Sequence, residues 1–248
     1  MPSFQKYEQK IRKYKDKLKN LITRIGISYN SEFELNNEIP EKFSLPCHIG
    51  FLFFGDYNKA LFEQIKYFLN QVYDSFFFSI RNLGNYKFSL DLVSKGVKTE
   101  FKEMKRSSGK IKIHPTNKFY QILINKRIEE NLGMVVAVTD LPLYSSNDDN
   151  IIFLFGETHL KHRCCVVSSL KLKEEFYNKM PNFEIFELRV IKEVIHEIGH
   201  IILGPDHCQT DSCVMTFSHH INNIDKKSFD FCDNCKLKFE QIRVQYNF

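Results

Sequence analysis

One short motif, HEIGH at residues 196–200, limits what this chain can fold into more than any other feature. It lies in a segment that follows Pro181-Asn182 and is predicted to be a helix from about Phe183 to Leu203. Two histidines four residues apart share one helical face, so both imidazoles can bind one Zn²⁺ at about 2.0 to 2.1 Å. Glu197 can then reach a metal-bound water and accept its proton. Two unrelated histidines on a polar helix face remain the alternative.

Further histidine and cysteine residues follow at spacings typical of metal ligands. After the bend residue Gly204, His207 offers a third imidazole that can complete a three-ligand site with one position open for water. Two cysteine pairs without a signal peptide indicate a four-thiolate structural zinc site rather than disulfides: Cys208, Cys213, Cys232 and Cys235. The other three cysteines lie in apolar strand candidates and are expected to be buried thiols: Cys47, Cys164 and Cys165.

Short apolar runs separated by helical segments predict an α/β or mixed-sheet fold. We expect strands at residues 47–55, 87–93, 134–139, 151–155 and 164–168. Besides the segment that carries the histidines, helices are expected at residues 58–75 and 116–131. Thr116 is expected to cap the second of these helices and Gly133 to end it.

The formal net charge of +5 over 248 residues is concentrated in two segments. Residues 1–24 carry eight basic and two acidic side chains, with apolar residues three and four apart, which predicts an amphipathic helix that ends at Gly26. This helix packs on the following domain, or it contacts nucleic acid or an acidic membrane. Residues 95–112 carry seven basic and two acidic side chains without apolar periodicity, so a surface loop is expected there.

Composition and length exclude several classes of protein. No stretch approaches the roughly 20 apolar residues that span a bilayer, and the N-terminus runs into charged residues instead of a signal-peptide core. A chain of this length can bury a core without disulfides. We therefore expect an intracellular, cytoplasmic monomer without a transmembrane segment. No stable nucleic-acid partner is expected, because few aromatic residues are interleaved with the basic ones.

The combined motifs resemble the signature of the archaemetzincins, a zinc metallopeptidase family within the metzincins. They are His196-Glu197-x-x-His200, then Gly204-x-x-His207-Cys208-x4-Cys213-x-Met215, then Cys232-x-x-Cys235. Neighbouring segments resemble the family too, at residues 153–157, 166–170, 189–193, 225–227 and 231–232. The resemblance covers residues 135–240 well and residues 45–75 loosely, and it leaves the N-terminal helix outside.

The resemblance implies a metzincin-like catalytic domain over residues 40–248, with a twisted mixed sheet above the zinc-binding helix. The basic amphipathic helix at residues 1–26 lies outside the resemblance and is expected to be an extension of this domain. It implies a peptidase that hydrolyses peptide or protein substrates with Glu197 as general base and two Zn²⁺ ions. The catalytic ion would bind His196, His200 and His207. The structural ion would bind Cys208, Cys213, Cys232 and Cys235, and Met215 would form a hydrophobic floor beneath the catalytic ion.

The sequence departs from the family pattern at the end of the predicted helix. The family has two residues between the second histidine and the glycine, whereas this chain has three, Ile201, Ile202 and Leu203. One additional helical residue adds about 1.5 Å and turns the chain by about 100°. If the helix end absorbs this residue, His207 remains a ligand. If it does not, the chain is a non-catalytic, zinc-stabilised binding module, and a third hypothesis is a nucleic-acid or membrane-surface binder.

Overall fold

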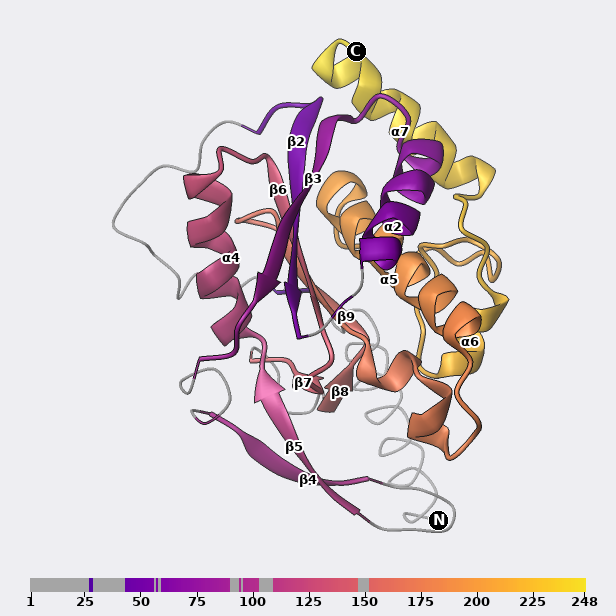
Figure 1. Cartoon of the computed structure of the whole chain (residues 1–248). Coiled ribbons are helices and arrows are strands. Elements are labelled where there is room, and N and C mark those ends of the chain that lie inside the picture. The colour runs from indigo at the N-terminus through magenta and orange to yellow at the C-terminus, as the bar shows by residue number, and fades with distance from the viewer. Residues whose placement is uncertain are drawn as a thin grey trace, which may run out of the picture.

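A six-stranded sheet forms the centre of the protein (Figure 1). This computed structural model describes residues 27–28, 43–55, 57, 59–89, 94, 96–102, 109–146 and 152–248. All neighbouring strands are parallel except β9 and β10, which are antiparallel. In sheet order the strands are β1 (Ile27–Ser28), β9 (Gly156–His159), β10 (Cys164–Ser168), β6 (Met134–Thr139), β2 (Cys47–Phe54) and β3 (Phe77–Tyr86).

Helices cover both faces of this sheet, which makes the fold mixed α/β as the sequence predicts. Figure 1 shows α4 (Asn117–Glu129) on one face, and α2 (Lys59–Val72) and α5 (Phe183–Leu203) on the other. Because side chains of a strand alternate between the faces, β2 contributes to two cores. Phe51 and Phe53 belong to the core that includes α2 and α5, whereas Leu52 and Phe54 belong to the core that includes α4.

The most apolar strand predictions are confirmed. Strands β6 and β10 are buried along their whole length, and β2 is buried except at His48. A strand in the middle of a parallel sheet is covered on both faces, so it is apolar at nearly every position. Such strands are recognisable in a sequence as uninterrupted apolar runs.

The strand predicted at residues 87–93 is wrong. The edge strand is β3 instead, residues 87–89 have no regular structure, and residues 90–93 lie outside the described residues. Strand β3 is only partly buried and contains polar residues such as Arg81 and Asn82. Its register against β2 shifts at two places, and Gly84 near the second shift has φ 85°.

Two helix predictions are confirmed with shorter bounds, but the predicted cap is wrong. Thr116 has helical angles, φ −62° and ψ −31°, and its side chain does not cap α4. Instead the Ser146 hydroxyl oxygen accepts the N–H of Asn117 at 3.0 Å. The residue before the helix has no extended conformation here, so its hydroxyl cannot turn back toward the first N–H groups.

A smaller sheet in the order β4-β5-β7-β8 corrects the prediction of a basic surface loop on both sides of residues 103–108, which lie outside the described residues. Its strands are Lys98–Lys102, Gly109–Pro115, Leu143–Tyr144 and Ile152–Leu154. Strands β4 and β5 are antiparallel and pair Lys98 with Ile113 and Lys102 with Gly109. The charged residues alternate with Thr99, Phe101 and Ile111, a period of two that the prediction overlooked.

Two other predictions concern a helix at residues 1–26 and the lack of a membrane-spanning segment. The helix expected at residues 1–26 lies outside the described residues, so both interpretations of it remain predictions. Among the described helices, none has both the length and the apolar character needed to cross a membrane.

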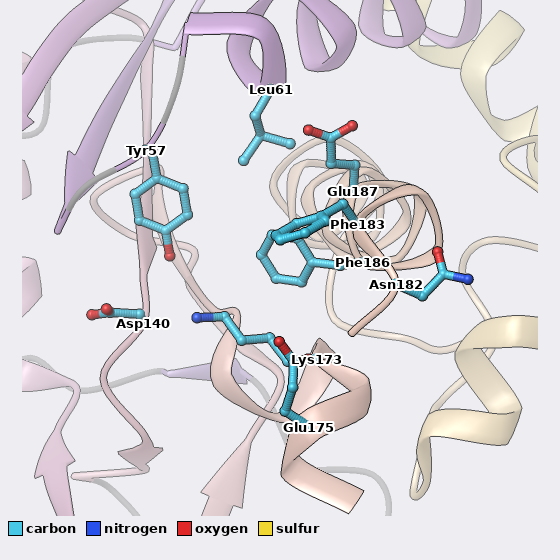
Figure 2. A pocket seen from close by; sticks show the side chains of 9 residues that line it. All are labelled: Tyr57, Leu61, Asp140, Lys173, Glu175, Asn182, Phe183, Phe186 and Glu187. Atoms are coloured by element: carbon cyan, nitrogen blue, oxygen red, sulfur yellow. The ribbon is translucent and has the colours of Figure 1, made fainter. Parts of the chain in front are cut away.

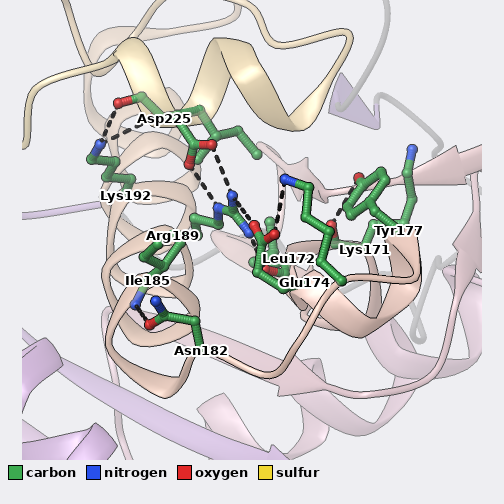
Figure 3. Close-up of polar contacts among 11 residues, drawn as sticks. Lys171, Leu172, Glu174, Tyr177, Asn182, Ile185, Arg189, Lys192 and Asp225 are labelled. Atoms are coloured by element: carbon green, nitrogen blue, oxygen red, sulfur yellow. Dashed lines mark hydrogen bonds and ion pairs between the residues drawn. The ribbon is translucent and has the colours of Figure 1, made fainter.

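An ion-pair network centred on the buried Arg189 joins helix α5 to the segments before and after it (Figure 3). The Arg189 guanidinium donates to both carboxylate oxygens of Asp225, at 2.7 and 2.8 Å, and to the Leu172 carbonyl at 2.9 Å. It also lies 2.5 Å from the Glu174 carboxylate. These partners belong to the short helices at Leu170–Leu172, Glu174–Tyr177 and Ile221–Lys226 (α6), so Arg189 fixes three segments around α5.

Helix α5 has the predicted bounds because both of its ends are specified by single residues. At the start, the Asn182 side chain accepts the N–H of Ile185 at 3.0 Å. At the end, Gly204 adopts φ 96° and ψ −172°, a conformation that is essentially restricted to glycine. The N–H of Gly204 still donates to the His200 carbonyl at 3.0 Å, so the chain leaves the helix axis directly after Leu203.

We expect Gly204→Ala to lower the free energy of unfolding by about 1 to 3 kcal/mol, the cost of forcing a β carbon into this conformation. No atom lies within 4 Å of the position that the β carbon would take, so a steric clash adds nothing. Urea unfolding followed by circular dichroism measures the change. Asn182→Ala, which removes the cap at the other end of the helix, serves as a reference with an expected cost of about 1 kcal/mol. An unchanged stability of Gly204→Ala would contradict the interpretation.

Candidate metal centre

Three imidazoles converge at the C-terminal end of α5. Nε2 of His200 lies 3.1 Å from Nε2 of His196 and 3.3 Å from Nε2 of His207. A tetrahedral Zn²⁺ at about 2.0 to 2.1 Å from each nitrogen would separate the nitrogens by about 3.4 Å. The structure thus brings all three predicted histidines together with the spacing that this ion requires.

Hydrogen bonds to backbone carbonyls decide which ring nitrogens are available. Nδ1 of His196 lies 2.8 Å from the Val214 carbonyl, and Nδ1 of His200 lies 3.0 Å from the Gly204 carbonyl. A carbonyl only accepts, so both rings carry their proton on Nδ1 and present the lone pair of Nε2. Two such lone pairs 3.1 Å apart repel each other unless a cation lies between them. The donor set therefore fits a divalent metal ion.

Burial keeps the three imidazoles neutral. It lowers the pKa of His196 well below its usual value, with a smaller contribution from the Lys227 ammonium. Burial likewise lowers the pKa of His200 to about 4 and that of His207 to about 3. Metal ligation by histidine requires the neutral ring, so the surroundings favour it near neutral pH.

The additional residue at the end of α5 does not remove His207 from this group. All three residues, Ile201 to Leu203, remain helical, and the chain reverses in the glycine-specific conformation at Gly204. Beyond this bend, the N–H of Cys208 donates to the Met215 carbonyl at 2.9 Å, which fixes the backbone next to His207. The hypothesis that the additional residue dismantles the site is therefore not supported.

Two residues of strand β9, Thr158 and Gly156, contact the side chain of Glu197. The Thr158 hydroxyl lies 2.6 Å from Oε2 of Glu197 and 2.9 Å from its backbone carbonyl. Gly156 leaves room for the carboxylate, since a β carbon there would lie only 2.5 Å from Oε1. Burial raises the pKa of Glu197 well above its usual value, opposed by the Thr158 hydrogen bond. A dication at the histidines would lower this pKa again.

Met215 packs against helix α5 at Gly199. Its side chain is 1% exposed, and a β carbon at position 199 would lie 2.3 Å from its Sδ atom, so only glycine fits there. The preceding residue, Val214, provides the carbonyl that orients His196. The segment around Met215 therefore supports the helix and the first imidazole together.

A buried charge pair lies behind the histidines. The Lys227 ammonium is 3.5 Å from Oε1 of Glu193 and 3.5 Å from Nδ1 of His196. Both side chains of the pair are almost completely buried, at 1% and 3% exposure. Because unpaired buried charges are costly, Glu193 and Lys227 stabilise each other at the back of the site.

The four predicted cysteines form a second group. Sγ of Cys208 lies 3.5 Å from Sγ of Cys232, and Sγ of Cys213 lies 3.8 Å from Sγ of Cys235. All four sulfurs lie within 4.8 Å of one another, and all are free thiols. A tetrahedral Zn²⁺ at about 2.3 Å from each sulfur places the sulfurs about 3.8 Å apart. These distances fit a metal ion and are too long for disulfide bonds.

Backbone N–H groups point at the sulfurs. The N–H of Cys232 donates to Cys213 at 3.3 Å, and that of Thr210 donates to Cys208 at 3.4 Å. Burial by itself would raise the pKa of Cys232, but hydrogen bonds from the Cys235 backbone and from neighbouring groups lower it to about 6. At least one thiol is thus readily deprotonated near neutral pH, which is the form that binds a metal.

Several residues that shape the site have no role predicted from the sequence. Thr158 and Gly156 belong to β9, a strand that was not predicted, although Gly156 lies in the family-like segment at residues 153–157. Lys227 and Glu193 were noted as parts of family-like segments without an assigned role. The signal in the sequence was that both are charged residues within segments that resemble the family, at residues 189–193 and 225–227.

Comparison with known proteins agrees with this geometry. The model of Peptidase family M54 matches residues 47–241. An archaemetzincin of Methanocaldococcus jannaschii is 38% identical over 122 residues, which are 49% of this chain and 66% of that protein. An archaemetzincin of Saccharolobus solfataricus is 44% identical over 94 residues, which are 38% of this chain and 50% of that protein. The aligned segments thus span less than two thirds of these relatives.

Solved structures share the fold at low sequence identity. An archaemetzincin from Methanopyrus kandleri is 20% identical with a TM-score of 0.59, and the match covers 84% of this chain and 99% of that one. A zinc-dependent peptidase from Methanocorpusculum labreanum is 20% identical with a TM-score of 0.58, and the match covers 77% of this chain and 98% of that one. The resemblance predicted from the motifs is confirmed, and because the family model matches most of the chain, the protein belongs to Peptidase family M54.

Proposed function

We propose that this chain is a zinc-dependent metallopeptidase that hydrolyses peptide bonds in peptide or protein substrates. The observation that carries the proposal is the convergence of three neutral imidazoles beside a buried carboxylate on the same helix. The spacing of His196, His200 and His207 fits one zinc ion, and Glu197 follows the first of them directly. Membership in a family of peptidases supports the same reaction.

The proposed mechanism assigns proton transfer to Glu197. Zinc, when held by the three histidines, supplies Lewis-acid polarisation of the scissile carbonyl and lowers the pKa of water. Glu197 accepts the proton of the attacking water and later passes it to the leaving amine. Thr158 and Gly156 keep the carboxylate in place for both transfers, since the hydroxyl holds one oxygen and the absent β carbon admits the other.

We further propose two zinc ions per chain, one at the histidines and one at the four cysteines. The sulfur distances and the N–H groups directed at Cys208 and Cys213 support a structural ion there. Since Cys208 directly follows His207, the structural ion would anchor the third histidine.

The seven free cysteines favour a reducing location, so the intracellular, cytoplasmic prediction is retained as a proposal. A monomeric state and the absence of a stable nucleic-acid partner remain predictions. The proposed boundary between a basic extension at residues 1–26 and a catalytic domain at residues 40–248 also remains a prediction, because most of residues 1–42 lie outside the described residues.

Replacing Glu197 by glutamine should stop peptide hydrolysis and leave the metal in place. Loss of a general base costs about 10²- to 10⁴-fold in rate, whereas the imidazole ligands are unchanged. Turnover of a quenched fluorescent peptide library and zinc content by atomic absorption give the two readouts. Glu184→Gln, in the exposed first turn of the same helix, is the matched control and should retain full activity. Undiminished turnover of Glu197→Gln would refute the assigned role.

Metal counting tests the two proposed ions separately from activity. The wild-type chain should retain two zinc ions after dialysis against zinc-free buffer. His207→Ala should retain about one, since the cysteine group is intact, while Cys235→Ser should weaken the second site and lower the melting temperature as well. Inductively coupled plasma mass spectrometry on the purified variants provides the count. A wild-type chain that holds one ion, unaffected by His207→Ala, would rule out the histidine site.

A further inference from the structure

A pocket lies at the N-terminal end of α5, away from the histidines at its C-terminal end. Its volume is about 220 Å³, room for about seven water molecules at about 30 Å³ each. Glu187 on its wall precedes His196 by nine helical residues, a rise of about 14 Å. The pocket is therefore separate from the candidate metal centre.

The pocket lies where the sheet topology favours ligand binding. Asp140 directly follows β6 and Tyr57 follows β2, so both lie beyond the carboxyl ends of adjacent parallel strands. From β2 the chain continues through α2 to β3 at one edge of the sheet, whereas β6 leads to β10 on the other side. In open α/β sheets, the crevice at such a change of direction is the usual ligand site.

Two oppositely charged side chains line the pocket without an ion pair in the described part of the chain. Asp140 and Lys173 take part in no ion pair or hydrogen bond through their side chains among the described residues, although both line this small space. Figure 2 shows the Lys173 side chain crossing the pocket toward the side where Asp140 and the Tyr57 hydroxyl lie. The Tyr57 hydroxyl is already engaged by the Ser169 hydroxyl at 2.7 Å. An ammonium group and a carboxylate that line the same pocket are thus available to a ligand.

The other end of the pocket carries apolar side chains, next to the Glu187 carboxylate, which accepts a hydrogen bond from the Gln64 amide at 2.8 Å. Leu61 is buried, and the Lys173 ammonium lies over the Phe186 ring, 5.7 Å from its centre. Phe183 is 77% exposed at the rim, an unusual position for such a large apolar side chain in the first turn of a helix. Figure 2 shows Phe183 and Phe186 together opposite the Asp140 side. A ligand that fits has two opposite charges at one end and an apolar group at the other.

We propose that this pocket binds a free α-amino acid with a large apolar side chain. Asp140 accepts hydrogen bonds from the ligand ammonium, and Lys173 donates to the ligand carboxylate. Phe183, Phe186 and Leu61 contact the side chain. The proposal does not depend on the peptidase function, because it rests on a different set of residues.

Isothermal titration calorimetry of the full-length, zinc-loaded protein with L-phenylalanine tests the proposal. Saturable binding near or below about 1 mM is expected for a ligand of this size. 2-Phenylethylamine lacks the carboxylate and 3-phenylpropionate lacks the ammonium, so each should bind about tenfold or more weakly. Glycine, which lacks the apolar group, should bind weakly as well. Equal binding of all four compounds would overturn the proposal, as would no saturable binding at about ten times that concentration.

Substitutions place the binding in the pocket. Asp140→Asn and Lys173→Gln should each weaken L-phenylalanine binding about tenfold or more, because a charge-assisted hydrogen bond is lost. Asp74→Asn and Lys236→Gln, both exposed and away from the pocket, are the matched controls and should bind like the wild type. Zinc content and the circular dichroism spectrum show whether each variant is folded. Binding that survives both pocket substitutions would locate the amino acid elsewhere, such as at the three histidines, and would overturn the proposal.

Discussion

The close approach of α5 to the segments on either side is the constraint on which the candidate metal centre depends. Gly156 faces the Glu197 carboxylate on one side, and Gly199 faces the Met215 thioether on the other. A β carbon at either glycine would come within 2.5 Å of these atoms, so the Glu197 or Met215 side chain, or the helix itself, would have to move. Metal ligands tolerate errors of only about 0.2 Å in distance. Gly156 and Gly199, which lack a β carbon, therefore contribute to the position of the imidazoles by allowing this close packing.

The third histidine obtains its position in a different way from the first two. His196 and His200 are placed by the helix, whereas His207 is placed by the cysteine group and by the Cys208–Met215 backbone hydrogen bond. His207 lies in a loop after the helix. The loop can therefore absorb the residue added at the helix end, and His207 still lies beside His200. The family pattern therefore tolerates this addition as long as a glycine terminates the helix, here Gly204 with φ 96°.

The elements that the sequence predicts well are those that are buried along their whole length or that carry a stop signal at each end. Helix α5 is recognised at both ends, and β6 and β10 are recognised because they are buried throughout. Prediction fails where tertiary contacts replace local signals. The edge strand β3 has one face partly in water, and Ser146 caps α4 although it lies 29 residues away. The approach of Thr158 to Glu197 likewise depends on the pairing of β9, which no local pattern encodes.

The irregular edge strand also has a consequence for how copies of this protein meet one another. An exposed edge offers a row of N–H and C=O groups on which a strand from another chain can add, and this leads to aggregation. The ten-residue strand β3 has one additional residue relative to β2 at each of two register shifts. At the second shift, Gly84 adopts a positive φ. Such bulges twist a strand and break the straight hydrogen-bonding row. A second chain therefore finds no continuous template there, although Phe78 at the first interruption is 68% exposed.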